Sequence, residues 1–128
     1  MDRQMSDSIG LSTELTDCDG IPIVRVRGEI DLYTAQEFER IMQTGVERST
    51  SILVVDLGEV SYVDSTGLST LLRAHKELSA RNADLYIIAP PGRPGVRRVL
   101  EITRIDALIQ VRGTVEDVLK ERQAAKAA

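Results

Sequence analysis

The stretch VDSTGLSTLL, residues 63–72, places three short polar side chains and a glycine between an apolar run and a helical pattern. The run SILVVDL, residues 51–57, lies just upstream and is apolar on consecutive positions, as is typical of a central strand covered on both faces. Downstream, helical spacing is kept by four leucines: Leu68, Leu71, Leu72 and Leu78. The sequence therefore predicts that the Asp-Ser-Thr-Gly cluster lies where a strand ends and a helix begins.

The neighbouring segments extend this unit into a sheet. DLYIIA, residues 84–89, is a second apolar run, so residues 51–89 predict a strand, a helix and a parallel strand with a right-handed crossover. Upstream, residues 11–16 and 21–26 flank the turn DCDG and predict an opening hairpin. Between the hairpin and the central strand, an amphipathic helix is expected to begin near Thr34.

Three shorter elements complete the prediction. Val96, Val99 and Leu100 mark a third helix, and a short strand is expected around residues 107–111. A fourth helix should begin at TVED, with Thr114 as its cap. The predicted fold is an α/β domain, a mixed β-sheet with an opening hairpin, about four to five strands and four helices packed on it.

Length and composition narrow the function classes. With 128 residues, a net charge of -4 and one cysteine, the chain fits one domain without disulfides, and nothing favours nucleic acid or an anionic membrane as a partner. We expect the domain at residues 11–119, a polar extension at 1–10, and the end of the last helix or a frayed tail at 120–128. No signal peptide is recognisable at the N-terminus, so a cytoplasmic setting is expected.

A catalytic role for Ser65 is not expected. The hydrolase motif Gly-x-Ser-x-Gly needs a glycine where Val63 stands, and the only histidine, His75, would be about 15 Å away along one helix. A phosphate-cradling loop is also absent, because the stretch has one glycine and no Gly-Lys-Ser/Thr ending. We therefore expect no enzymatic activity.

Two other roles for the cluster remain open and are compatible. Asp64 or Ser65 can be the N-cap of the helix, accepting hydrogen bonds from the amides of its first turn. A phosphate on Ser65 would also be tolerated at the positive end of a helix, and would change the surface charge by about -1.5 to -2. The cluster therefore predicts a helix cap, a phosphorylation switch, or both.

Three segments resemble the anti-sigma factor antagonists, small proteins made of a STAS domain. They are GEIDLYTA (residues 28–35), VVDLGEVSYVDSTGL (54–68) and VRRVLEITRID (96–106). The resemblance runs from about residue 11 to residue 119, and the two motifs together are more specific than either alone.

The resemblance implies a partner switch. Ser65 would be phosphorylated by a cognate anti-sigma factor, a serine kinase of the histidine-kinase-like ATPase fold. The unphosphorylated antagonist would bind that factor and free the sigma factor, and a PP2C-type phosphatase would restore it. ATP and magnesium would belong to the kinase, so this chain needs no cofactor or metal of its own. The implied partner-binding residues are Glu29, Asp31, Asp64, Ser65, Thr66 and Gly67.

Other candidates are weaker. Arg93 and Arg97 follow the second apolar run and can contact a phosphate or a partner, or belong to a solvated helix face. His75 and Cys18 are assigned no role. The chain is expected to be a monomer or a weak dimer. The alternatives are a STAS subunit of another signalling assembly, or a nucleotide- or anion-binding STAS module.

Overall fold

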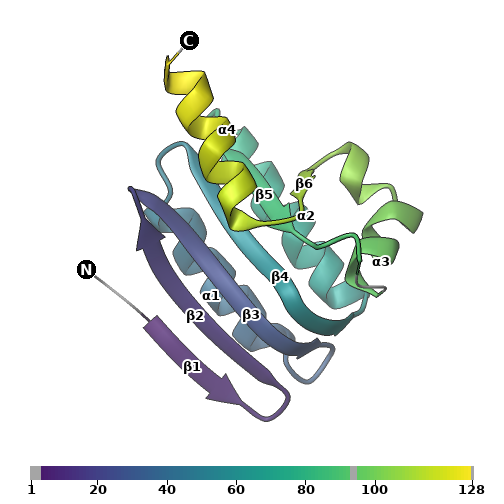
Figure 1. The fold of residues 1–128 in the computed structure, drawn as a ribbon. Coiled ribbons are helices and arrows are strands. Elements are labelled where there is room, and N and C mark those ends of the chain that lie inside the picture. Colours follow the sequence, from purple (N-terminus) through teal and green to yellow (C-terminus); the bar gives the residue numbers. More distant parts are fainter. Residues whose placement is uncertain (1–3, 93–94, 128) are drawn as a thin grey trace.

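A computed structural model describes residues 4–92 and 95–127, which form a mixed six-stranded sheet with four α-helices (Figure 1). The strands are β1 (Gln4–Ser8), β2 (Leu11–Cys18), β3 (Ile21–Ile30), β4 (Ile52–Val63), β5 (Asp84–Ile88) and β6 (Gln110–Arg112). The helices are α1 (Ala35–Arg48), α2 (Ser65–Ser79), α3 (Val96–Ile102) and α4 (Val115–Ala127), and a short 3₁₀ helix, η1, covers Ile105–Ala107.

The strands follow one another in the sheet in chain order. The pairs β1–β2 and β2–β3 are antiparallel, whereas β3–β4, β4–β5 and β5–β6 are parallel. The predicted α/β class, the opening hairpin β2–β3 and the parallel unit β4–α2–β5 are confirmed. Because β3 and β4 are parallel, their carboxyl ends, and the segments that follow them, lie at one edge of the sheet.

Strand β1 was not predicted and brings the sheet to six strands, above the expected four to five. It lies within residues 1–10, which we expected to form a polar extension, and it pairs with β2 from Gln4↔Leu15 to Ser8↔Leu11. Its sequence QMSDS lacks the apolar alternation of a half-buried strand. An edge strand is held by backbone hydrogen bonds along one side, so the sequence pattern carries little signal for it.

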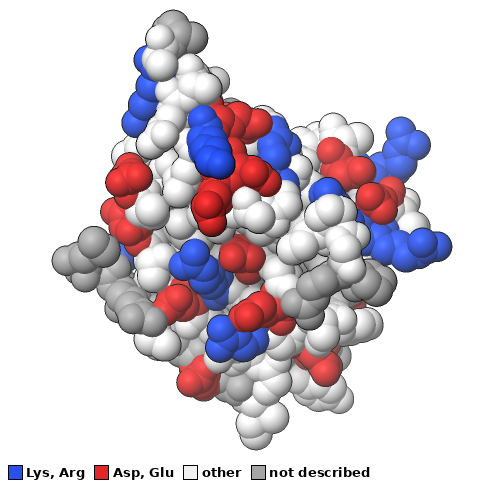
Figure 2. Space-filling model, viewed as in Figure 1, with Lys and Arg blue, Asp and Glu red and all other residues white. Residues whose placement is uncertain are grey.

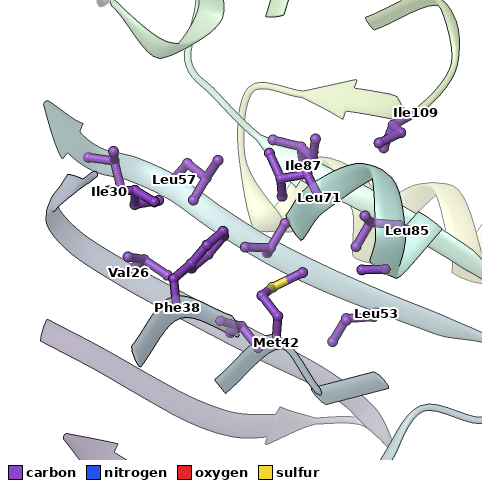
Figure 3. Close-up of a cluster of buried hydrophobic side chains, with 14 of the residues drawn as sticks. Val26, Ile30, Phe38, Met42, Leu53, Leu57, Leu71, Leu85, Ile87 and Ile109 are labelled. Carbon is purple, nitrogen blue, oxygen red and sulfur yellow. The ribbon is translucent and has the colours of Figure 1, made fainter. Parts of the chain in front are cut away.

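Helices α1 and α2 cover one face of the sheet, where the larger core forms (Figures 1 and 3). Phe38 and Met42 of α1 pack there with Leu71 of α2 and with strand residues such as Leu53 and Ile87. The helix expected near Thr34 is confirmed, since Thr34 is the N-cap of α1. Of the predicted leucine stripe on α2, Leu71 and Leu78 are buried, whereas Leu72 is 37% exposed.

The opposite face carries α4 and a smaller apolar cluster that includes the fully buried Val118 (Figure 1). Glu121 fastens α4 to β6, because Arg112 Nη2 lies 3.0 Å from its Oε1. The Arg112 guanidinium also lies 5.4 Å from the ring centroid of Tyr86. Burial raises the pKa of the Tyr86 hydroxyl. The predicted cap of this helix is confirmed, since the backbone amide of Asp117 donates to Oγ1 of Thr114 at 3.0 Å.

Beside α4, the open face of the sheet has a groove of about 980 Å³ that is lined by charged, polar and apolar side chains. Figure 2 shows acidic and basic side chains interspersed over this face rather than gathered by sign. Arg27 Nε lies 2.6 Å from Glu59 Oε2, and Arg25 lies 3.6 Å from a carboxylate oxygen of Asp56. Since these arginines face carboxylates, the groove offers no unbalanced positive charge to an anion.

The strand predicted around residues 107–111 lies slightly later in the chain. Residues 105–107 form η1, and β6 covers Gln110–Arg112. Arg104 has φ 64°, so the chain bends sharply between α3 and η1 before it can pair with β5. Among the described residues, no helix combines the length and apolar character needed to cross a membrane.

Candidate functional site at the start of α2

The site is built where β3 and β4 end side by side. Ile30 pairs with Val63 in the parallel register, and the backbone amide of Asp64 donates to the carbonyl oxygen of Ile30 at 3.1 Å. Helix α2 begins with the next residue, Ser65. The first turn of α2 is therefore fixed directly to the end of β3 as well as to its own strand.

Asp64 is the N-cap of α2. Its Oδ1 accepts hydrogen bonds from the backbone amides of Thr66 at 2.9 Å and Gly67 at 3.3 Å, and from the hydroxyl of Thr66. The hydrogen bond from the Thr66 hydroxyl is the main cause that holds the pKa of the Asp64 carboxyl below its ordinary value; desolvation opposes it, and the amides of Gly67 and Thr66 lower the pKa further. Of the two capping candidates left open by the sequence, the structure selects Asp64.

Ser65 is the first residue of α2 and is exposed. Thr66 is only half-buried, but its hydroxyl is directed back to the Asp64 carboxylate. The two adjacent hydroxyl residues therefore differ in availability, although both are chemically able to accept a phosphate. Ser65 also lies at the end of α2 where the helix dipole favours negative charge.

Gly67 allows the first turn of α2 to lie against the strand ends. A Cβ placed on it would come within 2.6 Å of Cγ2 of Ile30 and of Cγ2 of Val63. Real Cβ atoms do not approach other carbon atoms so closely, so any larger residue would push the helix start outward. In the Asp-Ser-Thr-Gly cluster, the glycine thus serves packing and the aspartate serves capping, while the serine is left at the surface.

The second predicted motif, GEID, covers the last three residues of β3 and the first residue of the loop that follows it. Gly28 has φ 112°, and a Cβ on it would lie 2.2 Å from the carbonyl oxygen of Gly10 in the β1–β2 turn. The backbone amide of Glu29 donates to that same carbonyl at 2.9 Å. The side chain of Glu29 is exposed at this edge of the sheet. Gly28 is therefore needed for the contact that joins the β1–β2 turn to β3.

Asp31 braces the loop between β3 and α1. Its Oδ1 accepts hydrogen bonds from the backbone amides of Tyr33 at 2.9 Å and Thr34 at 3.1 Å. The hydroxyl of the buried Thr34 in turn donates to the carbonyl of Glu29 at 2.8 Å. The carboxylate that the resemblance assigned to a partner surface is thus engaged in holding the loop closed.

Four exposed apolar side chains surround this edge, and our reading of the sequence missed them. Leu32 and Tyr33, in the loop after β3, are 71% and 92% exposed. Tyr62, near the end of β4, is 52% exposed, and Ile9, in the β1–β2 turn, is 99% exposed. A usable signal was present in GEIDLY, because Leu32 and Tyr33 lie in the short segment between the strand and the helix.

Of the remaining candidates, Arg97, His75 and Cys18 lie among the described residues. Arg97 is half-buried in the first turn of α3, and a Cβ on Gly95 before it would lie 3.8 Å from the carbonyl of Ser61. Arg93 lies outside the described residues. His75 is half-buried on α2, and Cys18 is half-buried at the end of β2.

The site has the chemistry of a phosphate acceptor. His75 follows Ser65 by ten positions on the same helix, about 15 Å of rise, so it is not placed to activate that hydroxyl. In residues 4–92 and 95–127, no group of three or more histidine, cysteine or acidic side chains is arranged to hold a metal ion. An exposed hydroxyl at the amino end of a helix can instead receive a phosphate from another protein.

Comparisons with known proteins find matches in sequence over most of the chain. The sequence model of the STAS domain matches residues 12–118. An anti-sigma-B factor antagonist of Staphylococcus aureus (strain NCTC 8325 / PS 47) is 36% identical over 103 residues, which are 80% of this chain and 94% of the relative. The corresponding protein of Listeria monocytogenes is 34% identical over 105 residues, 82% of this chain and 90% of the relative.

Solved structures show the same fold. The crystal structure of an anti-sigma factor antagonist from Mycobacterium paratuberculosis has a TM-score of 0.80 and 30% identity, and the match covers 91% of this chain and 97% of that one. The unphosphorylated form of the anti-sigma factor antagonist SpoIIAA has a TM-score of 0.71 at 18% identity, with 88% and 96% covered. The phosphorylated form of SpoIIAA, from Bacillus, has a TM-score of 0.61 at 18% identity, with 85% and 97% covered.

Proposed function

Because this chain belongs to the anti-sigma factor antagonist family of STAS-domain proteins, we propose that it controls a sigma factor by partner switching at Ser65. The unphosphorylated form binds an anti-sigma factor and thereby frees the sigma factor. Phosphorylation of Ser65 ends this binding. The observation that carries the proposal is that Ser65 is exposed while Asp64 and Gly67 build the helix start around it.

A phosphate on Ser65 is compatible with the fold. The side chain lies at the surface, so the modification displaces no buried group. The amino end of α2 favours negative charge, although the Asp64 carboxylate already occupies the amides of Thr66 and Gly67. The phosphate therefore changes the surface that a partner meets, rather than the packing beneath it.

Release follows from electrostatics and solvation. A partner that covers Ser65 would have to remove water from about two negative charges next to the Asp64 carboxylate. Each tenfold loss of affinity requires only about 1.4 kcal/mol, so this cost is sufficient to switch binding off. SpoIIAA, a protein of the same fold, has been solved in its phosphorylated form.

The proposal includes the components that act on Ser65. The anti-sigma factor is itself the serine kinase, of the histidine-kinase-like ATPase fold, and it supplies ATP and magnesium. A PP2C-type phosphatase removes the phosphate and restores binding. The chain acts in the cytoplasm, as a monomer or a weak dimer, and performs no catalysis of its own.

The alternative of a nucleotide- or anion-binding module is less well supported. The amides of Thr66 and Gly67 at the start of α2 already donate to Asp64. The Arg25 and Arg27 side chains in the open-face groove face Asp56 and Glu59. Neither place offers an anion a set of unengaged donors.

The test is phosphoryl transfer with purified components. Anti-sigma factor kinases from the same genome, together with the anti-sigma-B factor of Staphylococcus aureus, are incubated with the chain and radiolabelled ATP and magnesium. We expect at least one kinase to bind the chain and to label Ser65, as mapped by mass spectrometry. A chain that is neither bound nor labelled by any of them would refute the proposal, and calorimetric titration with ATP and GTP would then test the nucleotide-binding alternative.

A further inference from the structure

We propose that Ile9, Leu32, Tyr33 and Tyr62, here called the apolar rim, form the docking surface for an apolar patch on the anti-sigma factor, with Tyr33 as its main anchor. The inference rests on the proposed function and adds the chemistry of the contact. Burial of the rim supplies the affinity, and the phosphorylation state of Ser65 beside it determines whether the partner can bind.

The rim concentrates exposed apolar surface at one end of the molecule. Eight large hydrophobic side chains are exposed among the described residues, and four of them belong to the rim. They come from the β1–β2 turn, the β3–α1 loop and the end of β4, which lie together at one edge of the sheet (Figure 1). Exposed apolar surface gathered in this way marks sites of protein association.

Backbone hydrogen bonds fasten the three segments of the rim to one another. Glu29 pairs with Tyr62 in the β3–β4 register, and its amide donates to Gly10, the residue after Ile9, at 2.9 Å. One residue further along β3, the carbonyl of Ile30 accepts the amide of Asp64 at 3.1 Å. The backbone segments that carry the rim are therefore joined to the strand end that precedes Ser65, so a protein that covers Ser65 comes close to the rim.

Tyr33 is already held in a defined backbone position. The Asp31 carboxylate accepts the backbone amides of Tyr33 and Thr34, which closes the loop that presents the ring. A tyrosine loses few rotamers when it is buried, and aromatic residues supply a large share of the energy of protein interfaces. Asp31 thus acts as a positioning residue for Tyr33.

The occupant is the anti-sigma factor rather than a second copy of this chain. A symmetric dimer that buried the rim would also cover Ser65, and the kinase must reach that hydroxyl. The rim residues are uncharged, so the fitting surface is apolar, and Glu29 at the same edge adds a charged margin. A partner that covers the rim also removes water from around Ser65. A phosphate at Ser65 would lose its hydration in the complex, and this cost weakens binding.

The test measures affinity for the kinase that labels Ser65 in the transfer experiment above. By calorimetry in ADP and magnesium, we expect Tyr33→Ser to weaken binding at least about tenfold and Tyr62→Ser to weaken it by a smaller factor. Leu108→Ser is the matched control, because Leu108 is 56% exposed but lies between η1 and β6, and it should change affinity by less than about threefold.

The outcomes separate the two proposals. If wild type is bound and labelled but Tyr33→Ser and Tyr62→Ser bind as tightly as Leu108→Ser, the apolar rim is not the docking surface, while the proposed function stands. If sedimentation velocity shows that wild type self-associates and that Tyr33→Ser abolishes this, the rim belongs to a homodimer and the inference is overturned. If no kinase binds the wild-type chain, both the proposed function and the docking surface are contradicted. Circular dichroism of each variant checks that these surface changes leave the fold intact.

Discussion

The hydroxyl of Thr66 donates a hydrogen bond to the carboxylate of Asp64, whereas Ser65, between them in sequence, is exposed. Two adjacent residues with similar chemistry therefore differ in how available their hydroxyl groups are. One hydroxyl is part of the cap of α2, and the other belongs to the molecular surface.

This inequality predicts which hydroxyl is phosphorylated. With a competent kinase, Ser65→Ala should abolish labelling, while Thr66→Val should keep it, because valine preserves the shape of threonine and Ser65 remains exposed. Mass spectrometry of the labelled peptides gives the site directly. Substantial phosphate on Thr66 in the wild-type chain would show that the Asp64 hydrogen bond does not protect it.

Asp64 should stabilise the fold in a pH-dependent way. Asp64→Ala removes the cap and should lower the free energy of unfolding by about 1 kcal/mol at neutral pH. Asp64→Asn keeps a good cap but cannot titrate. Because the hydrogen bond from Thr66 lowers the pKa of Asp64 in the folded chain, the ionised carboxylate contributes fully above the ordinary carboxyl pKa of 3.8 and loses its contribution as the pH falls below it.

Urea denaturation at about pH 6 and at about pH 3 measures this effect. The stability advantage of wild type over Asp64→Asn should shrink at the lower pH. An advantage that stays constant or grows on acidification would contradict the lowered pKa.

Gly67 should tolerate no side chain. A methyl group there meets Ile30 and Val63 at 2.6 Å, so Gly67→Ala should lower the free energy of unfolding by about 1–3 kcal/mol. Gly92→Ala is the control, since a Cβ at that position has no atom within 4 Å, and its effect should stay within about 0.5 kcal/mol. Equal stability of the two variants in urea would show that α2 shifts outward at little cost.

A negative charge at Ser65 should change binding without unfolding the domain. Ser65→Ala should keep its affinity for the anti-sigma factor, and Ser65→Glu should lose at least about tenfold, although a carboxylate carries less charge than a phosphate. Ser69→Glu, on the same helix one turn further on, controls for the charge alone. Thermal and urea unfolding should place Ser65→Glu within about 1 kcal/mol of wild type. A larger loss of stability would indicate a switch that acts by disrupting the fold.

Arg97 provides the test of a phosphate contact. If its guanidinium approaches phosphorylated Ser65, it should lower the second pKa of the phosphoserine, ordinarily about 6, and Arg97→Ala should raise that pKa again. Phosphorus NMR titration measures both forms. Arg73→Ala, at an exposed arginine of α2 that lies 3.8 Å from Glu39, is the control. A pKa that is the same with and without Arg97 would exclude the contact.

The sequence predicted the elements whose side chains show a clear pattern of burial. The continuous apolar run of β4 and the helical spacing of α1 and α2 report burial, and burial decides these elements. Strand β1 was not predicted because it is held by backbone hydrogen bonds at the edge of the sheet. Such pairing places few constraints on the side chains, so it leaves little pattern in the sequence. The 3₁₀ turn at residues 105–107 escaped because it depends on the backbone of Arg104.

At the site, the residue types were predictable but their tasks were not. Asp64 and Ser65 are both good N-caps, and a shift of the helix start by one residue exchanges their roles. The sequence GEIDLYTA does not specify the turn geometry after β3. The hydrogen bonds of Asp31 within its own loop, and the resulting exposure of Tyr33, depend on that geometry. Family resemblance points to one edge of the sheet, and the contacts show which atoms there are available.

The closed loops at Asp31 and Asp64 also bear on the speed of association. Both carboxylates hold their segments in place before any partner arrives, so little chain has to be ordered during the encounter. For two surfaces that are already formed, the association rate is set mainly by diffusion and orientation, and differences in affinity appear mostly in dissociation. Phosphorylation of Ser65 would then act chiefly by shortening the lifetime of the complex.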